Sequence, residues 1–495
     1  MTRERKMSLL FTLAGFLFVL CPSAPAQSLR LPPHEKFVLK NGLTVLLMEK
    51  RGVPLINVFA LVKTGAAADP AGQEGLASVT ADLLRKGTKT RTAQQFSADF
   101  DYIGGSFGAD VGADFTNVSA EFLTKDLARG LELFSDAVLH PTFPQSETDK
   151  ILAQSLDGVK SEKDEPQAVL GLYYGGYLYG AHPYGRPSDG DELSLKRIQR
   201  DAIVKFYETN YAPGNTILGV AGEFDAVEMR KKLEETLGAW PARTVATTSI
   251  SAVPPVKGKR LLLIDKPDAT QTYFAIGNIG TAVNDPDRIA IRVVNTIFGG
   301  RFTSELNEAL RVESGYTYGA RSFFDSRRAP GPFEIASFTK NETTTPAIDL
   351  ALQVLEKLHK NGVSAEQLAS AKSYIKGQFP PTIETSGQLV RRIVFNEYYG
   401  LGDDEVNQLE SRVDAVTPAI AKQVIDKHFP LENLVFVLIG NASAIGPAVK
   451  KYADKMDQRP IAIPVSGRHR RALRNNWMQR NSSGIKGLFR VLQEE

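Results

Sequence analysis

An internal repeat constrains the fold of this chain more than any other feature of its sequence. An Ala-Ile-Val-Lys segment ending at Lys205 precedes the strand-like run NTILGVAGE at 215–223. An Ala-Ile-Ala-Lys segment ending at Lys422 likewise precedes NLVFVLIGN at 433–441, and the two lysines are 217 positions apart. Self-similarity at such a long and steady spacing indicates a duplicated domain. The 495 residues therefore contain one fold twice.

The beginnings of the two halves also match. The runs LTVLLMEK at 43–50 and RLLLIDKP at 260–267 are apolar and end in charged residues, which is typical of buried strands. The Pro-, Ser- and Thr-rich stretch at 239–258 has no apolar period and suits an exposed connection. We therefore predict an α+β fold with homologous domains at 27–238 and 259–465, each a mainly antiparallel sheet covered by helices.

The N-terminus has the pattern of a cleavable signal peptide. Basic residues precede the apolar run MSLLFTLAGFLFVLC, and the small residues Ala24 and Ala26 flank Pro25. The run is too short for an ordinary membrane span, so we predict a signal peptide at 1–26, a mature chain without a transmembrane span and a periplasmic or secreted location. Cys21, the single cysteine, would be removed, which excludes a disulfide scaffold. A lipoprotein role for Cys21 is the alternative, although bulky Leu20 precedes it.

Charge is unevenly distributed along the chain. The formal net charge is +3; the leader contributes +2 and the tail at 466–495 contributes +5, which leaves −4 for the residues between them. A body with this balance has no concentrated basic face, so nucleic acid is not an expected partner. The basic tail fits a solvated terminus, and contact with a surface or a partner is the alternative.

Several motifs in the same order give the chain a resemblance to a known family. The segment GLASVTADLLRKGT at 75–88 resembles GLAH-x-x-EH-x-x-F-KGT, the signature helix of the pitrilysin/insulinase-type zinc peptidases, or inverzincins. DEP at 164–166, HPYGRP at 182–187, NYAPGN at 210–215 and GGRFTSELNEALRVESGYTYG at 299–319 extend this resemblance over most of the mature chain. It implies that the two halves form a clamshell.

The residues that bind and use zinc in this family are replaced. In H-x-x-E-H, two histidines four positions apart bind the metal, and the glutamate activates its water. The corresponding positions hold Ser78, Ala81 and Asp82, and alignment through the acidic-proline motif puts Gly158 where the third ligand belongs. The apolar pattern of this helix predicts that positions 78, 81 and 82 lie on the side away from the apolar residues, with Ser78 and Asp82 on a solvated face. We therefore expect no metal in this chain.

Two other metal sites can be considered from the sequence. Asp82 and Asp157 could form an oxygen site, but two carboxylates without a third ligand would bind a cation weakly. The six histidines show no metal-ligand spacing with one another: His34, His140, His182, His359, His428 and His469.

The second half keeps a different family motif. The sequence LRVESGYTY at 310–318 matches LR-x-x-x-GxxY, whose arginine and tyrosine hold the substrate backbone and stabilise the developing oxyanion in these peptidases. The resemblance gives this role to Arg311 and Tyr318. Apolar spacing predicts that Arg311 lies in the last turn of a helix, and Gly315 permits a sharp exit into a strand that contains Tyr318. A structural role for both residues, at a helix end and in a half-buried strand, is the alternative.

A glycine-rich segment at 104–122 is a further candidate for substrate contact. Glycines in a strand can allow another backbone to approach, and the corresponding family strand accepts substrate by β-addition. An ordinary twisted or bulged strand explains the segment equally well.

The resemblance leads to two functional hypotheses. The first is a non-catalytic, peptide-binding subunit of a heteromeric zinc metallopeptidase, which supplies Arg311 and Tyr318 to a partner of the same family that carries the zinc. The second is a catalytically inactive peptide-binding or structural scaffold of the same fold. An autonomous peptidase would require a metal site that the sequence lacks.

Overall fold

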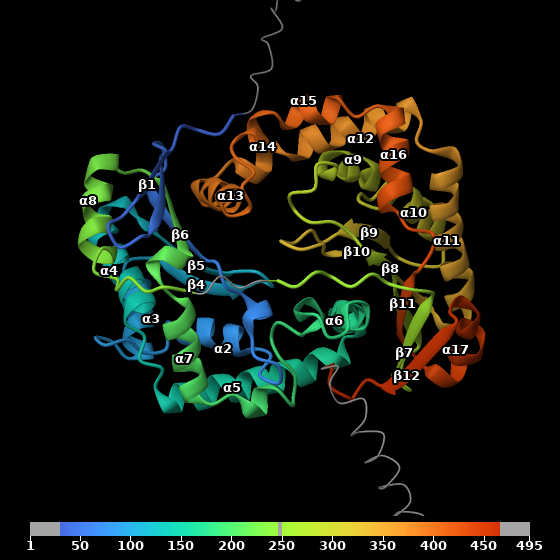
Figure 1. The fold of residues 1–495 in the computed structure, drawn as a ribbon, viewed down its shortest axis with the longest axis horizontal. Helices are drawn as coiled ribbons and strands as arrows, with labels where there is room; N and C mark the ends of the chain where they lie inside the picture. Colours follow the sequence, from blue (N-terminus) through green and yellow to red (C-terminus); the bar gives the residue numbers. More distant parts are fainter. Residues whose placement is uncertain (1–29, 246–249, 466–495) are drawn as a thin grey trace, which may run out of the picture.

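The computed structural model describes residues 30–245 and 250–465, and it contains two six-stranded sheets side by side (Figure 1). The predicted signal peptide and basic tail lie outside the described residues. The first sheet has the order β1-β2-β6-β3-β5-β4, and its strands are β1 (Glu35–Val38), β2 (Thr44–Glu49), β3 (Leu55–Val62), β4 (Ser106–Val111), β5 (Thr116–Leu123) and β6 (Thr216–Gly222). The second has the order β12-β7-β11-β8-β10-β9, with β7 (Arg260–Asp265), β8 (Gln271–Ile279), β9 (Ala320–Phe324), β10 (Pro332–Lys340), β11 (Val435–Gly440) and β12 (Lys455–Pro460).

The two sheets repeat one topology. From β2 or β7 onward the strand orders correspond one to one, with a single parallel pair, β2 with β6 or β7 with β11, followed by antiparallel pairs. The sheets differ at the opposite edge, where β1 pairs antiparallel with β2 whereas β12 pairs parallel with β7. The predicted α+β fold with two homologous, mainly antiparallel halves is confirmed.

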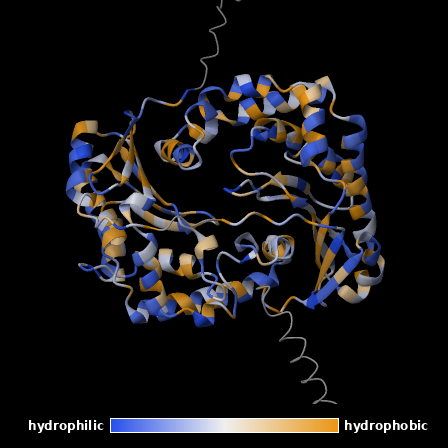
Figure 2. Ribbon diagram, viewed as in Figure 1, coloured by the Kyte–Doolittle hydropathy of each residue, from blue (hydrophilic) through white to orange (hydrophobic). Residues whose placement is uncertain are grey.

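The central strands are apolar along their whole length because both of their faces are covered. Nearly every residue of β3 is buried, and so is every residue of β6 and of β11. The edge strand β12 is hydrophilic, as Figure 2 shows, and its charged side chains protect an open sheet edge from unwanted pairing.

Helices cover both sheets. Those of the first half are α2 (Leu76–Leu83), α3 (Ala93–Tyr102), α4 (Leu127–Leu139), α5 (Gln145–Ser161), α6 (Pro166–Tyr179), α7 (Arg200–Asn210) and α8 (Ala226–Leu237). Those of the second half are α9 (Arg288–Phe298), α10 (Glu305–Asn307), α11 (Thr344–Asn361), α12 (Ala365–Gln378), α13 (Ser386–Tyr399), α14 (Asp404–Asn407), α15 (Leu409–Asp414), α16 (Pro418–His428) and α17 (Ala442–Val449). Within the described ranges, no helix has the length and apolarity needed to span a membrane.

Helix α13 of the second half packs against the sheet of the first half (Figure 1). It covers β3 and β6, where Phe395 lies 5.8 Å from Phe59 between ring centroids. Gly219 of β6 makes this contact possible, because a Cβ atom there would come within 2.5 Å of methyl groups of both Val390 and Val394. The first sheet therefore depends on the second half for part of its core.

Helix α6 of the first half makes the reciprocal contact with the second sheet. Its tyrosines join β7, β8 and β11 in one buried cluster, and the Tyr174 hydroxyl donates to the carbonyl oxygen of Phe333 at 2.8 Å. The two exchanged helices begin at Pro166 and Ser386, 220 positions apart, so they are equivalent elements of the repeat. Separating the halves would expose both apolar interfaces, which holds the two sheets together as one body.

The connection at 239–258 forms no helix or strand among its described residues and is mostly exposed. Trp240 and Val256 are buried exceptions. The side chain of Asn41 holds the start of the connection by donating to the carbonyl oxygens of Leu237 and Trp240, at 2.8 and 3.2 Å.

Candidate functional site

Helix α2 carries the positions that correspond to the zinc motif. Ser78 is half-buried, and its hydroxyl donates to a carboxylate oxygen of Asp189 at 2.9 Å. Ala81 is only 2% exposed, so the side of the helix predicted to lie away from the apolar residues is itself covered at this position. The helix packs against α5 and α7 as well as against the sheet. These extra contacts make its exposed polar face narrower than the spacing of apolar residues indicated.

Asp82 is also half-buried rather than solvated. Burial raises the pKa of its carboxyl group; nearby Arg85 opposes this change, and Asp189 adds to it. Asp189 therefore acts on both polar residues at the zinc-motif positions: it accepts a hydrogen bond from Ser78 and contributes to the raised pKa of Asp82. This loop residue was not singled out from the sequence.

The position of the third ligand has no side chain. Gly158 lies on α5, and a Cβ atom built there would meet no atom within 4 Å, so the space beside it is open. Asp157 is exposed and lies 3.2 Å from Lys160. Among the described residues, no group of three potential metal ligands forms around α2, and an oxygen site built from Asp82 and Asp157 has no third ligand in the structure.

One such group does form elsewhere in the described chain, from Asp285, Asp287 and His428. Asp287 accepts from the Lys427 ammonium at 2.7 Å and lies 2.9 Å from Nε2 of His428. The hydrogen bonds from Lys427 and His428 lower the pKa of the Asp287 carboxyl group. A lysine already neutralises this carboxylate, so the cluster is an ion-pair network that the histidine spacing in the sequence did not reveal.

Arg311 lies in a wide helical turn that directly follows α10. This π-helical turn (Glu308–Glu313) is followed by Ser314, whose N–H donates to the carbonyl oxygen of Ala309, five residues earlier, at 3.1 Å. Gly315 then adopts φ +65°, which favours glycine and turns the chain sharply. The predicted helix end and glycine exit are confirmed.

Tyr318 does not lie in a strand, contrary to the prediction. β9 begins at Ala320, and Tyr318 precedes it in an irregular segment with 81% of its surface exposed. Thr317 explains the delay, because its hydroxyl bonds with both the N–H and the carbonyl oxygen of Gly319 and closes a local turn. The phenol is thereby presented to solvent rather than packed on the sheet.

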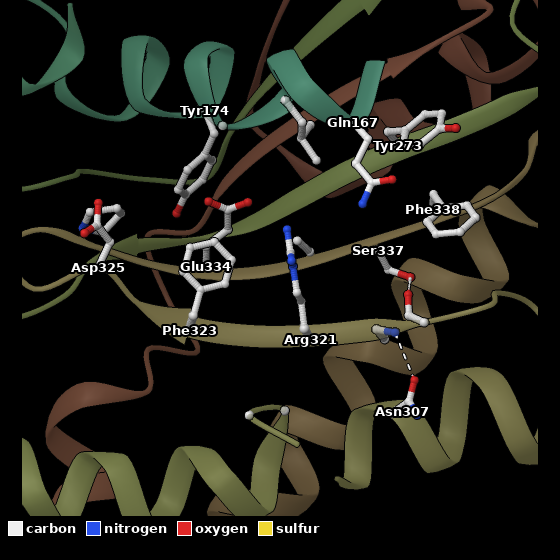
Figure 3. Close-up of a pocket in the computed structure, with 18 of the residues that line it drawn as sticks. Gln167, Tyr174, Tyr273, Asn307, Arg321, Phe323, Asp325, Glu334, Ser337 and Phe338 are labelled. Carbon is white, nitrogen blue, oxygen red and sulfur yellow. Dashed lines mark hydrogen bonds between the residues drawn. The ribbon is translucent and has the colours of Figure 1, made fainter. Parts of the chain in front are cut away.

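Arg311 and Tyr318 line one groove of 840 Å³ between α6 and the β8-β10-β9 edge of the second sheet. Helix α6 covers β8 and β11 and leaves the outer strands open on the same face. Figure 3 shows side chains from both walls turned into this space, among them Gln167 and Tyr174 of α6 and Arg321 of β9. None of the positions replaced in the zinc motif is among the residues lining this groove.

The base of the groove contains a buried acidic residue. Glu334 of β10 is 5% exposed and pairs with Phe323 of β9. Arg321 lies two residues before Phe323 on the same strand. Burial raises the pKa of the Glu334 carboxyl group to about 7, although Arg321 acts in the opposite direction. The sequence contains a signal for Glu334, because it is the single charged residue in the apolar run PFEIASF at 332–338. The sequence-based hypothesis did not use this signal.

The glycine-rich segment forms the edge of the first sheet. β4 pairs with β5 on one side, and no other described strand pairs with it. It therefore has an unpaired edge of the kind that β-addition requires, and substrate binding there stays a prediction.

Comparison with known proteins relates the chain to the peptidase family M16. A sequence model described as insulinase (peptidase family M16) matches residues 44–187, and one described as the peptidase M16 inactive domain matches residues 197–375. An uncharacterized zinc protease of Bacillus subtilis is 22% identical over 402 residues, covering 80% of this chain and 97% of that protein. An uncharacterized zinc protease of Mycobacterium leprae is 24% identical and covers 83% and 92%, respectively.

Solved structures share the fold. The crystal structure of a peptidase M16 inactive domain from Pseudomonas fluorescens matches with a TM-score of 0.78 and 26% identity, covering 82% of this chain and 98% of that one. A protease from Helicobacter pylori matches with a TM-score of 0.76 and 20% identity over 83% and 100% of the two chains, which shows the fold alone. Because the two family matches follow one another across both halves and solved M16 proteins have the same architecture, this chain belongs to the insulinase-type peptidase family M16.

Proposed function

We propose that this chain is the non-catalytic, substrate-binding subunit of a heteromeric zinc metallopeptidase that acts on unfolded peptides. The observation that carries the proposal is an asymmetry between the two halves. The metal-ligand positions of the first half hold Ser78, Asp82 and Gly158, whereas the second half presents Arg311 and Tyr318 at an open groove.

The zinc in this proposal belongs to a partner subunit of the same family with an intact H-x-x-E-H motif. Serine and alanine at the first histidine and glutamate positions supply neither a strong zinc ligand nor a base, and Gly158 supplies no ligand at all. With the predicted leader removed, the complex would work in the periplasm or outside the cell.

The two retained side chains have the chemistry for carbonyl binding. The Arg311 guanidinium is a fixed cation with several N–H donors, and the exposed Tyr318 hydroxyl is a neutral donor. Both would donate to the peptide carbonyl oxygen on which negative charge develops opposite the partner's metal. The Arg311 guanidinium does not have to leave an ion pair to bind substrate, since no carboxylate of the described chain lies within ion-pair distance of it.

Reconstitution tests this role. The purified chain is expected to contain no stoichiometric zinc and to cleave no peptide, and co-expression with the zinc-bearing family member should produce peptidase activity. Arg311→Ala and Tyr318→Phe should each lower kcat of the complex about a hundredfold, the usual effect of losing one oxyanion donor.

Matched controls separate this role from general damage. Arg230 of α8 stacks over the ring of Phe37, 3.9 Å from its centroid, and Tyr102 of α3 is 91% exposed. Neither residue lines the groove, so Arg230→Ala and Tyr102→Phe should leave the activity unchanged. Zinc-dependent cleavage by the isolated chain would contradict the proposal. Full activity of a complex carrying both Arg311→Ala and Tyr318→Phe would instead support the inactive scaffold.

A further inference from the structure

Three arginines of the groove are held by aromatic rings. The guanidinium carbon of Arg311 lies 4.4 Å from the ring centroid of Phe302, that of Arg301 lies 5.8 Å from Tyr374, and that of Arg321 lies 5.5 Å from Phe323. No ion pair joins any of these three arginines to a carboxylate of the described chain. Stacking uses the flat face of a guanidinium and leaves its N–H edge free to bind a carboxylate with two parallel hydrogen bonds.

The donors of these arginines are not all satisfied. Arg301 donates from one terminal nitrogen to the Ser370 hydroxyl at 3.0 Å, while its buried Nε has no hydrogen-bond partner among the described residues. Arg321 points from β9 into the groove, where Figure 3 draws it between Glu334 and Gln167. A buried donor without a partner lowers stability, so an acceptor delivered by a ligand would be favoured at this place.

The charges of the groove do not balance. Nη2 of Arg327 lies 2.6 Å from a carboxylate oxygen of Asp325, so this ion pair carries no net charge. The remaining charged lining residues are Arg301, Arg311, Arg321 and the single acid Glu334, so the excess is positive. Clefts with low-dielectric walls concentrate such an excess and attract ligands of opposite charge.

We propose that this groove binds a carboxylate group of the substrate peptide through Arg321 and Arg311, and that Arg321 thereby gives the subunit a preference for peptides with a carboxylate near the bound carbonyl. The inference rests on the proposed substrate-binding function and names its substrate class. The carboxylate can come from the C-terminus of a peptide or from an aspartate or glutamate side chain.

A cationic ligand for Glu334 is the competing possibility. Its carboxyl group is buried at the base of the groove, where Arg321 is the charged residue that favours its ionised form. A lysine or arginine side chain of a peptide would, however, have to pass Arg301, Arg311 and Arg321, and Glu334 is the single acid that can offset their charge. Repulsion between like charges opposes the entry of such a side chain, so the carboxylate is the better-matched ligand.

Binding to the isolated full chain tests the preference without any need for catalysis. A short fluorescein-labelled, unstructured peptide is prepared with a free C-terminus, with a C-terminal amide, and as amides with a central Glu, Gln or Lys. Fluorescence anisotropy should show that a carboxylate-bearing peptide binds about tenfold more tightly than its uncharged counterpart, as one charge-assisted contact allows. The free C-terminus and the central Glu identify which source of carboxylate is used.

Two variants assign the effect to the groove. Arg321→Gln should remove the tenfold advantage, Arg311→Gln should reduce it, and the stacked control Arg230→Gln should keep it. Circular dichroism checks that each variant is folded, which the exposure of Arg321 favours. Equal or tighter binding of the Lys peptide, or an unchanged advantage in Arg321→Gln, would overturn the inference.

The outcome is separable from that of the proposed function. A preference that depends on Arg321 in the isolated chain, combined with full activity of the Arg311→Ala and Tyr318→Phe complex, would retain the carboxylate site and reject the oxyanion role. Loss of activity in those complexes without any carboxylate preference would retain the oxyanion role and reject the carboxylate site.

Discussion

The replacement Glu334→Gln should stabilise the protein in a pH-dependent manner. Glu334 is buried in β10, and burial raises the pKa of its carboxyl group from 4.5 to about 7. Arg321 lowers this pKa and Asp325 raises it, while Tyr174 of α6 packs nearby with a neutral hydroxyl. Glutamine keeps the size of the side chain and removes its titration.

The direction and size of the effect follow from the two pKa values. Below the unfolded value of 4.5, both states are protonated and the ionisation has no cost. Between 4.5 and about 7 only the unfolded chain releases the proton, so the wild-type stability falls as the pH rises. At about 1.4 kcal/mol for each pH unit of that interval, the wild-type protein loses about 3 kcal/mol that the glutamine variant keeps.

Urea denaturation followed by circular dichroism measures this difference. The unfolding free energy of Glu334→Gln minus that of the wild type should rise by about 3 kcal/mol from about pH 4 to about pH 8. Glu121→Gln on β5 is the matched control, because Glu121 is exposed and its replacement should give a difference that hardly depends on pH. A constant difference for Glu334→Gln across this range, or a less stable variant at about pH 8, would refute the reasoning.

Two further predictions concern the contacts that hold the fold together. Gly219→Ala should lower the unfolding free energy by about 1–3 kcal/mol in urea denaturation, because its methyl group would collide with Val390 and Val394 of α13. Adding Val390→Ala should recover part of this loss, and additive losses would contradict the contact. Arg91→Ala should cost about 3 kcal/mol, since it leaves the buried carboxylate of Asp136, 2.8 Å from Arg91, without its cation. A calorimetric melting temperature equal to that of the wild type would show that the two threonine hydroxyls bonded to Asp136 suffice.

The sequence predicted the candidate site in part. The replaced metal ligands could be assigned because helical spacing and the surrounding motif are local properties, and Gly315 correctly indicated the sharp turn after Arg311. The predicted strand around Tyr318 was wrong, because the hydroxyl of Thr317 forms a local turn that alternation of side chains does not reveal. Arg321 and Glu334 were missed for a related reason: each is unremarkable by itself, and only strand pairing brings them together.

The amino-acid sequence by itself determined the duplicated fold, the apolar strands β2, β6, β7 and β11 and the loss of the zinc ligands. These features depend on residue identity and on periods of two or 3.6 residues, which are present along the chain. Only the tertiary structure decided which sheet each half's helices cover. The exchange of α6 and α13 between the halves, the groove beside α6 and the positive excess inside it arise from contacts between residues far apart in sequence. Hydrophobic burial rewards any well-packed apolar face, whichever half supplies it, so local pattern could not specify that choice.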